Sequence, residues 1–265
     1  MAAKKECLSP AVDRALSILE AISEGNSGLT NAHLARRLGI PKSSACSILS
    51  VLQERGYLCR FPENGRYKLG FQLLTLGRQL LDTSVIRDLA LPLMRDLVDR
   101  VDLTCHLAIL GHQEAVHYEK IAARRYFKQD KTRAIGDRVP LHASSVGKAL
   151  LAWQTPPALD VYLPGTGLRK SSPRTITDRS RLLLKLEEVR KQGYAIDDQE
   201  CRLGWRCVGA PIFDQWGSTR VAICLTGTVV ELDDSKMAET AVAVKETAQK
   251  ISRRLASEHV EFATY

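Results

Sequence analysis

Basic and hydroxyl side chains gather between residues 36 and 68 at spacings suited to holding a nucleic acid. Cations bind phosphate oxygens and fix the register of a protein on a duplex, and short polar side chains on a helix can approach the base edges in a major groove. We therefore predict a DNA-binding surface in this part of the chain. The predicted DNA-contacting residues are Arg36, Arg37, Lys42, Ser43, Ser44, Ser47, Arg60, Arg66 and Lys68.

A second set of residues has spacings that occur in enzymes. Ser145 and Lys148 fit the S-x-x-K pattern of serine acyl-enzymes, but those enzymes also need S-D-N and K-T-G elements, which this sequence lacks. His142 and Cys207 would form a thiol nucleophile only within hydrogen-bonding reach, and a buried structural histidine is the better default. The histidines show no H-x-x-x-H metal spacing. We predict no catalytic residue, no metal site, no cofactor and no enzymatic activity.

Two short helices must position the polar side chains of the first set. Thr30 suits the N-cap of the first helix and Gly39 its end. Ile40 precedes a proline and so avoids helical angles, whereas Pro41 suits the first turn of the next helix. The spacing predicts a bent helix pair whose second helix can enter a major groove, although two helices alone fit a solvated helical hairpin equally well.

The residues after Gly56 favour the DNA-binding interpretation. Two short runs rich in strand-forming residues, 57–61 and 66–69, flank Pro62-Glu63-Asn64-Gly65, which is a strong β-hairpin signal. Such a wing would place its cations beside phosphates. The whole segment is therefore predicted to be a winged helix-turn-helix.

Charge and composition agree with a division into two parts. Residues 1–80 carry eleven Lys/Arg and six Asp/Glu, a net of +5, whereas the other 185 residues carry 27 and 24, a net of +3. No segment approaches the roughly 20 apolar residues of a membrane span, and the first residues lack the apolar core of a signal peptide. Seven scattered cysteines without a C-x-x-C pair indicate neither disulfides nor zinc. We expect a cytoplasmic protein that does not bind membranes.

The rest of the chain alternates between helical and extended patterns. Apolar spacing predicts a helix over 8–24, a helical linker over 71–81 and a helix from 85 to about 100. Further on, strands are expected at 103–110, 115–121, 207–213 and 219–225, and helices from 144, over 178–192 with Thr177 as cap, and over 234–256. This pattern indicates an α+β fold with a C-terminal sensing domain.

Several motifs in register resemble the IclR family of bacterial transcriptional regulators. They are Ile40-Pro-Lys-Ser-Ser44, Gly65-Arg-Tyr-Lys-Leu-Gly70, the run from Val139 to Ala152, Gly193-Tyr-Ala-Ile-Asp-Asp-Gln-Glu200 and the run from Gly204 to Asp214. The resemblance extends from about residue 10 to residue 256. It implies a winged helix-turn-helix at 1–69, a helical linker at 70–83 and a GAF-like effector-binding domain at 84–265.

The resemblance also implies partners and site residues. The partners are double-stranded operator DNA, a small organic acid or aromatic catabolite, and other copies of the chain in a homodimer or a dimer of dimers, acting as repressor or activator. The implied effector residues are Val139, Ser145, Val146, Asp197, Cys207, Cys224 and Thr226. Backbone N–H groups after Ser144 could bind an anion. Lys131 and Arg133 could pair with a carboxylate at the rim of the pocket, although a solvated charged strand is the better expectation for them.

Four positions depart from the family's pattern, and they leave the ligand and the operator open. Cys224 and Thr226 stand where serines are frequent, Val146 is bulkier than the usual alanine, and Ser47 stands where the family often has arginine. An RNA-binding or nucleoid-associated protein is the second hypothesis by class, because it explains the basic N-terminus but gives the large C-terminal part no role.

Overall fold

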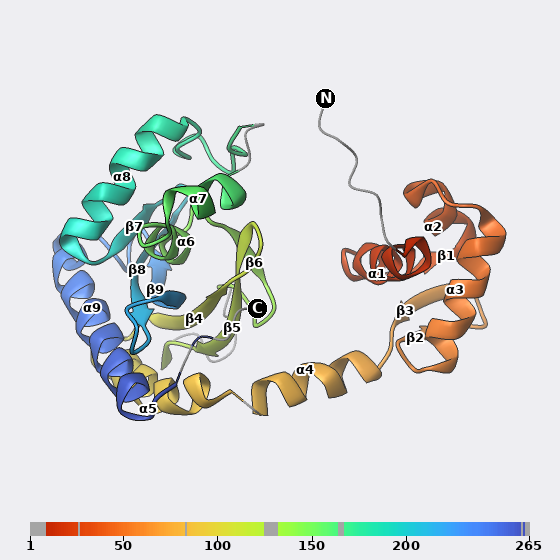
Figure 1. The fold of residues 1–265 in the computed structure, drawn as a ribbon, viewed down its shortest axis with the longest axis horizontal. Helices are drawn as coiled ribbons and strands as arrows, with labels where there is room; N and C mark the ends of the chain where they lie inside the picture. The colour runs from red at the N-terminus through yellow and green to blue at the C-terminus, as the bar shows by residue number, and fades with distance from the viewer. Residues whose placement is uncertain are drawn as a thin grey trace. The chain divides into compact units, whose positions relative to one another are not determined.

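The computed structural model describes residues 9–25, 27–82, 84–124, 132–163, 167–260 and 262. The chain divides into two compact units, Met1–Thr83 and Ser84–Tyr265 (Figure 1). The helix of the predicted linker segment is grouped with the N-terminal unit. None of the described helices is long and apolar enough to cross a membrane.

The N-terminal unit is a helical core joined to a small antiparallel sheet. Its strand order is β1-β3-β2. In chain order its elements are α1 Pro10–Ser23, β1 Leu29–Thr30, α2 Asn31–Leu38, α3 Lys42–Glu54, β2 Leu58–Arg60, β3 Arg66–Leu69 and α4 Gln72–Asp82.

Local residue choices place these helices as the sequence predicts. The Thr30 hydroxyl accepts a hydrogen bond from the His33 N–H at the start of α2, and Gly39 ends α2 with a left-handed φ of 64°. Pro41 is the N-cap of α3. Apolar side chains from α1, α2, α3 and the hairpin then form one core, whose fully buried members include Ile18, Leu34 and Leu49. The predicted bent helix pair is confirmed.

The predicted wing is also present. Strands β2 and β3 pair antiparallel, and the turn between them is closed by the Gly65 N–H, which donates to the Phe61 carbonyl at 2.9 Å. Gly65 adopts a φ of 63°, a conformation that glycine reaches without the strain of a Cβ. The N-terminal unit is therefore a winged helix-turn-helix.

The C-terminal unit is built on one six-stranded antiparallel sheet with the order β6-β5-β4-β9-β8-β7. Its helices cover both faces of this sheet (Figure 1). In chain order its elements are α5 Val85–Val101, β4 Thr104–Leu110, β5 Glu114–Ile121, β6 Arg138–Pro140, α6 Ser145–Leu151, α7 Pro156–Tyr162, α8 Arg179–Gln192, β7 Ala195–Asp198, β8 Trp205–Phe213, β9 Thr219–Thr228 and α9 Asp234–Ser257.

Each sheet face has its own apolar core. Odd-numbered residues of β4 and β9, such as Leu107 and Ile223, pack with α5 and α9. Even-numbered residues of the same strands, such as Ala108 and Ala222, pack with α6 and α8. Because side chains alternate along a strand, every even-numbered residue of β4 and β9 faces α6.

A β-bulge interrupts the alternation in β5. His117 is opposite Ala108 of β4, but Glu119 is opposite Leu107, so Tyr118 is an extra residue in β5. His117 therefore faces α6, whereas Glu119 faces α5, where its carboxylate forms an ion pair with Arg87.

Some details of the secondary structure differ from the sequence-based expectations. Asp178, rather than Thr177, caps α8, because its carboxylate accepts from the Arg181 N–H at 2.8 Å. Asp197 lies on strand β7, which was not among the expected strands. Short elements that lack a clear period, namely β1, β6 and α7, were not anticipated.

Candidate functional site

The predicted DNA-contacting side chains lie on α2, α3 and the β2–β3 hairpin of the N-terminal unit. Three side chains in the first turns of α3 are exposed, namely Lys42, Ser43 and Ser47. Arg36 and Arg37 in the last turn of α2 are also exposed. The hairpin adds Arg60, Lys68 and the partly buried Arg66. These positions form one polar and basic set on a DNA-reading fold.

Several of these side chains already have partners within the unit. Arg66 donates from Nη1 to the Gly28 carbonyl at 3.0 Å, which ties the wing to the loop before β1. Arg37 forms an exposed ion pair with Glu24. The Ser44 hydroxyl accepts from Arg14 at 3.3 Å.

Other cations of the set could contact phosphates, because no carboxylate pairs with them among the described residues. Arg60 and Lys68 lie over the rings of Tyr67 and Phe61, at 5.9 and 5.1 Å from the ring centroids. Within the part of the chain that the structure describes, Arg60, Lys68, Arg36 and Lys42 form no ion pair, so these four are the cations best placed for phosphate contacts.

A cavity of about 50 Å³ lies beside the start of α6 in the C-terminal unit. All seven residues that the sequence motifs implied for effector binding line it: Val139, Ser145, Val146, Asp197, Cys207, Cys224 and Thr226. Other residues of its lining are His117, Thr132, Arg133, Ser144, Cys201, Arg202 and Trp205. Lys131, which was expected at the rim, is outside the described residues.

Neighbouring strands bring polar side chains together on this face of the sheet. Asp197 on β7 is opposite Cys207 on β8, which in turn is opposite Thr226 on β9. The Thr226 hydroxyl donates to the Cys207 sulfur at 3.3 Å. Burial raises the pKa of the Cys207 thiol well above its usual range and that of Cys224 to about 12. These thiols are therefore protonated and act as weak hydrogen-bonding groups, not as nucleophiles.

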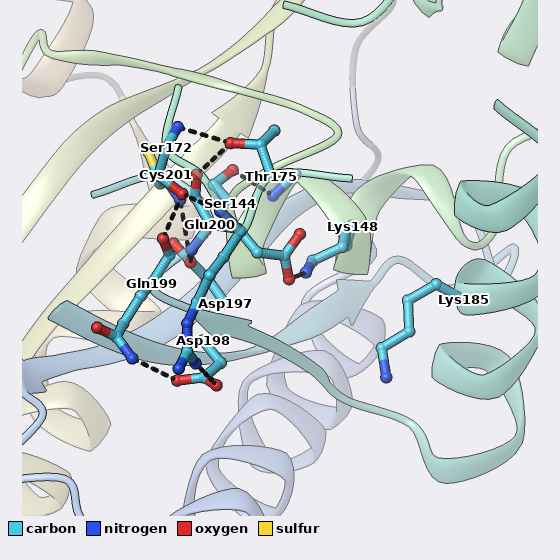
Figure 2. Close-up of polar contacts among 12 residues, drawn as sticks. Ser144, Lys148, Ser172, Thr175, Lys185, Asp197, Asp198, Gln199, Glu200 and Cys201 are labelled. Atoms are coloured by element: carbon cyan, nitrogen blue, oxygen red, sulfur yellow. Dashed lines mark hydrogen bonds and ion pairs between the residues drawn. The ribbon is translucent and has the colours of Figure 1, made fainter. Parts of the chain in front are cut away.

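A buried polar network holds the β7 end of the cavity (Figure 2). Lys148 of α6 is fully buried and forms an ion pair with Glu200. The backbone N–H groups of Glu200 and Cys201 donate to the Asp197 carboxylate at 2.7 and 3.2 Å. Burial raises the pKa of Asp197 to about 7, although the charge of Lys148 opposes the shift. The network fixes the turn after β7 against α6.

Hydroxyl groups of the loop before α8 complete this network. Ser172 and Thr175 donate to the carbonyl oxygens of Gln199 and Glu200, each at 2.7 Å (Figure 2). The loop from 171 to 175 is thereby attached to the same turn after β7.

The enzyme-like spacings do not assemble into catalytic groups. Lys148 of the S-x-x-K match forms an ion pair with Glu200. The His142 Nε2–H donates to the Arg169 carbonyl at 2.9 Å. His142 also lines a basic hollow of about 480 Å³ that includes Arg133, Arg138 and Lys170. No group of three or more His, Cys, Asp or Glu side chains among the described residues is placed to bind a metal ion.

The motifs missed part of the cavity lining. His117 was not anticipated, nor were Trp205, Cys201 and Arg202. The sequence signal for His117 was weak, because regular alternation would put it on one strand face with both Ala115 and Glu119. The bulge at Tyr118 puts His117 and Glu119 on opposite faces, and the position of this bulge cannot be predicted from the sequence alone.

Family models match most of the chain. "Bacterial transcriptional regulator IclR C-terminal" matches residues 78–253, and "IclR helix-turn-helix domain" matches residues 11–60. Among curated proteins, the HTH-type transcriptional regulator XynR of Escherichia coli is 34% identical over 92% of this chain and 96% of its own length. The HTH-type transcriptional regulator BhcR of Paracoccus denitrificans is 33% identical over 91% of this chain and 86% of its own.

Solved structures share the fold along nearly the whole chain. The crystal structure of the Thermotoga maritima IclR is 30% identical, with a TM-score of 0.69 over 92% of this chain and 98% of that one. An IclR homolog from Microbacterium hydrocarbonoxydans, complexed with 4-hydroxybenzoate, is 25% identical, with a TM-score of 0.75 over 92% of this chain and 98% of that one.

Proposed function

Because this chain belongs to the IclR family of bacterial transcriptional regulators, we propose that a small organic acid or aromatic compound binds in the cavity beside α6 and changes the affinity of the protein for its operator. The DNA-binding surface in this proposal consists of α3 in the major groove and the β2–β3 wing on the phosphates. A ligand shifts DNA affinity only by as much as it prefers one conformation of the protein over another.

One observation carries the effector part of this proposal. The seven residues implied by motif position lie between 139 and 226 in the sequence, on four strands and one helix, and all line the same cavity. A packed core would leave no space there. The polar lining and the relative that binds 4-hydroxybenzoate support a ligand with oxygen-bearing groups.

Self-association is the second part of the proposal, because operator half-sites are read by paired units. Exposed apolar side chains on α1, namely Val12 and Leu16, offer a surface for a second copy. Phe71, Leu74 and Leu80 in and before α4 are also exposed, at 87%, 69% and 61%. We propose that these surfaces form a homodimer or a dimer of dimers.

Fluorescence anisotropy tests the proposed function. The purified chain is titrated onto duplex DNA flanking its own gene, at several salt concentrations and with a panel of carboxylic and aromatic acids. We expect tight binding that weakens steeply with salt and changes with one class of compound. Equal affinity for random duplex, together with tighter binding to RNA, would instead favour the RNA-binding hypothesis.

A further inference from the structure

Two buried histidines on the cavity face of the sheet lack hydrogen-bond partners. His106 is fully buried with both ring nitrogens unpartnered, and His117 is 4% exposed with its Nδ1 unpartnered. Their ring centroids are 4.7 Å apart. Buried ring nitrogens are almost always satisfied in native proteins, so this pair needs an explanation.

The sheet register places this pair at the cavity. His117 lines the cavity directly. His106 lies on the neighbouring strand β4, opposite Cys224, which also lines the cavity. Both histidines therefore face α6, and His106 contacts His117 from the neighbouring strand without lining the cavity itself.

Neither imidazole carries a charge at neutral pH. Burial is the largest cause that lowers the pKa of both rings, that of His117 to about 4, and the charge of Arg133 lowers both further. A neutral imidazole has one N–H donor and one nitrogen acceptor. It can therefore donate to a carbonyl or a hydroxyl oxygen, and it can also accept from a hydroxyl, which a carboxylate cannot offer.

The size of the cavity and the charge of Arg133 further restrict which compounds can bind. A volume of about 50 Å³ corresponds to roughly three to five water molecules, which suits a compound of two to four carbons better than an aromatic ring. The exposed Arg133 also lines the cavity, and its guanidinium is suited to a carboxylate.

We propose that His117, positioned by His106, is a specificity-determining residue of the cavity. It binds the uncharged hydroxyl or carbonyl oxygen of a small hydroxy or oxo acid, whose carboxylate lies toward Arg133. This inference rests on the proposed effector role of the cavity. It adds a chemical criterion, namely that the protein selects acids with the additional oxygen over acids of the same carbon number that lack it.

Matched pairs of acids test this criterion by calorimetry on the full-length chain. The probes are glycolate against acetate, and lactate and pyruvate against propionate. We expect a member with the additional oxygen to bind about 10- to 100-fold more tightly than its partner, because the partner leaves the imidazole unsatisfied. The affinity ratio is the affinity of the member with the additional oxygen divided by that of its partner. An affinity ratio below about threefold in every pair, or no binding by any of these acids, overturns the inference.

Substitutions assign the effect to the histidine. In His117→Leu we expect the ratio to fall to about one, while the melting temperature of the unliganded protein stays equal or rises, because an unpartnered polar group has been removed. His117→Gln, which keeps a donor and an acceptor, should restore part of the ratio. His112→Leu is the matched control on the exposed turn between β4 and β5. A wild-type ratio in His117→Leu overturns the inference.

His106 is tested separately as a positioning residue. In His106→Leu we expect a reduced ratio together with shifted imidazole ¹⁵N resonances of His117, and unchanged resonances would overturn its role. The failure of this inference differs from that of the proposed function. If only aromatic acids bind and alter DNA affinity, the proposed function holds and the histidine criterion fails; if no compound alters DNA affinity, both fail.

Discussion

The buried ion pair between Lys148 and Glu200 makes a strong prediction about stability. Their side chains are 0% and 10% exposed, and the carboxyl of Asp197 lies in the same network. Lys148→Met keeps the length of the side chain but leaves the acidic groups without their cation. Removing one partner of a buried pair costs about 3–5 kcal/mol. For a unit of this size, that corresponds to a loss of about 6–20 °C in melting temperature.

A double-mutant cycle separates the charge from the packing. Glu200→Gln combined with Lys148→Met removes both charges, and replacing a whole buried pair with uncharged groups is often close to neutral. The double variant should therefore be more stable than Lys148→Met alone, with a coupling energy of at least about 2 kcal/mol. Lys185→Met is the control, because its pair with Glu188 is partly exposed and should contribute about 0–1 kcal/mol.

Tryptophan fluorescence is the assay for this cycle. Trp153, Trp205 and Trp216 are the only tryptophans, and all three belong to the C-terminal unit, so urea unfolding followed by their emission reports on this unit alone. A cost below about 1 kcal/mol for Lys148→Met would refute the reasoning. So would a double variant whose loss equals the sum of the two single losses.

Three further results are expected. Lys68→Ala should weaken binding to every duplex and reduce the slope of log affinity against log salt by about one, whereas the exposed Lys250→Ala should leave the slope unchanged in the same anisotropy assay. Because burial raises the pKa of Asp197 from 3.8 to about 7, the folded chain keeps a proton that the unfolded chain releases, so its contribution to stability is lost as pH rises through about 7. Asp197→Asn should accordingly gain melting temperature relative to the unsubstituted chain between pH 5 and 7.5, and a constant difference would contradict the shift. Gly147→Ala should destabilise the C-terminal unit by at least about 2–3 kcal/mol in urea unfolding, because its Cβ would lie 2.3 Å from the Leu141 carbonyl oxygen; wild-type stability would show that this backbone can move.

Much of the fold could be predicted because its signals are local. Thr30 and Gly39 act within one turn of a helix, and the turn at Gly65 needs only its own neighbours. The information for these features lies within a short stretch of sequence. The seven cavity residues, by contrast, were implied by the resemblance to the family and not by local signals.

The missed features depend on contacts between distant parts of the chain. Lys148 and Glu200 are 52 positions apart, and neither residue type indicates the other. The His106–His117 contact requires the register of β4 against β5, which the bulge changes by one residue. Arg66 was expected at phosphates, yet its link to Gly28 depends on the path of the loop before β1.

The extra residue in β5 places nearby side chains of one strand on opposite faces of the sheet. In regular alternation, His117 and Glu119 would share a face; with Tyr118 inserted, the histidine meets the cavity and the glutamate meets Arg87 in the first turn of α5. The Tyr118 hydroxyl also lies 3.4 Å from that of Ser84, the N-cap of α5. Ligand-binding and helix-anchoring groups are thus sequence neighbours on opposite faces. If all residues of β5 paired with β4 in regular alternation, Glu119 would turn toward the cavity and lose its ion pair with Arg87, whereas deletion of Tyr118 would leave both side chains on their present faces.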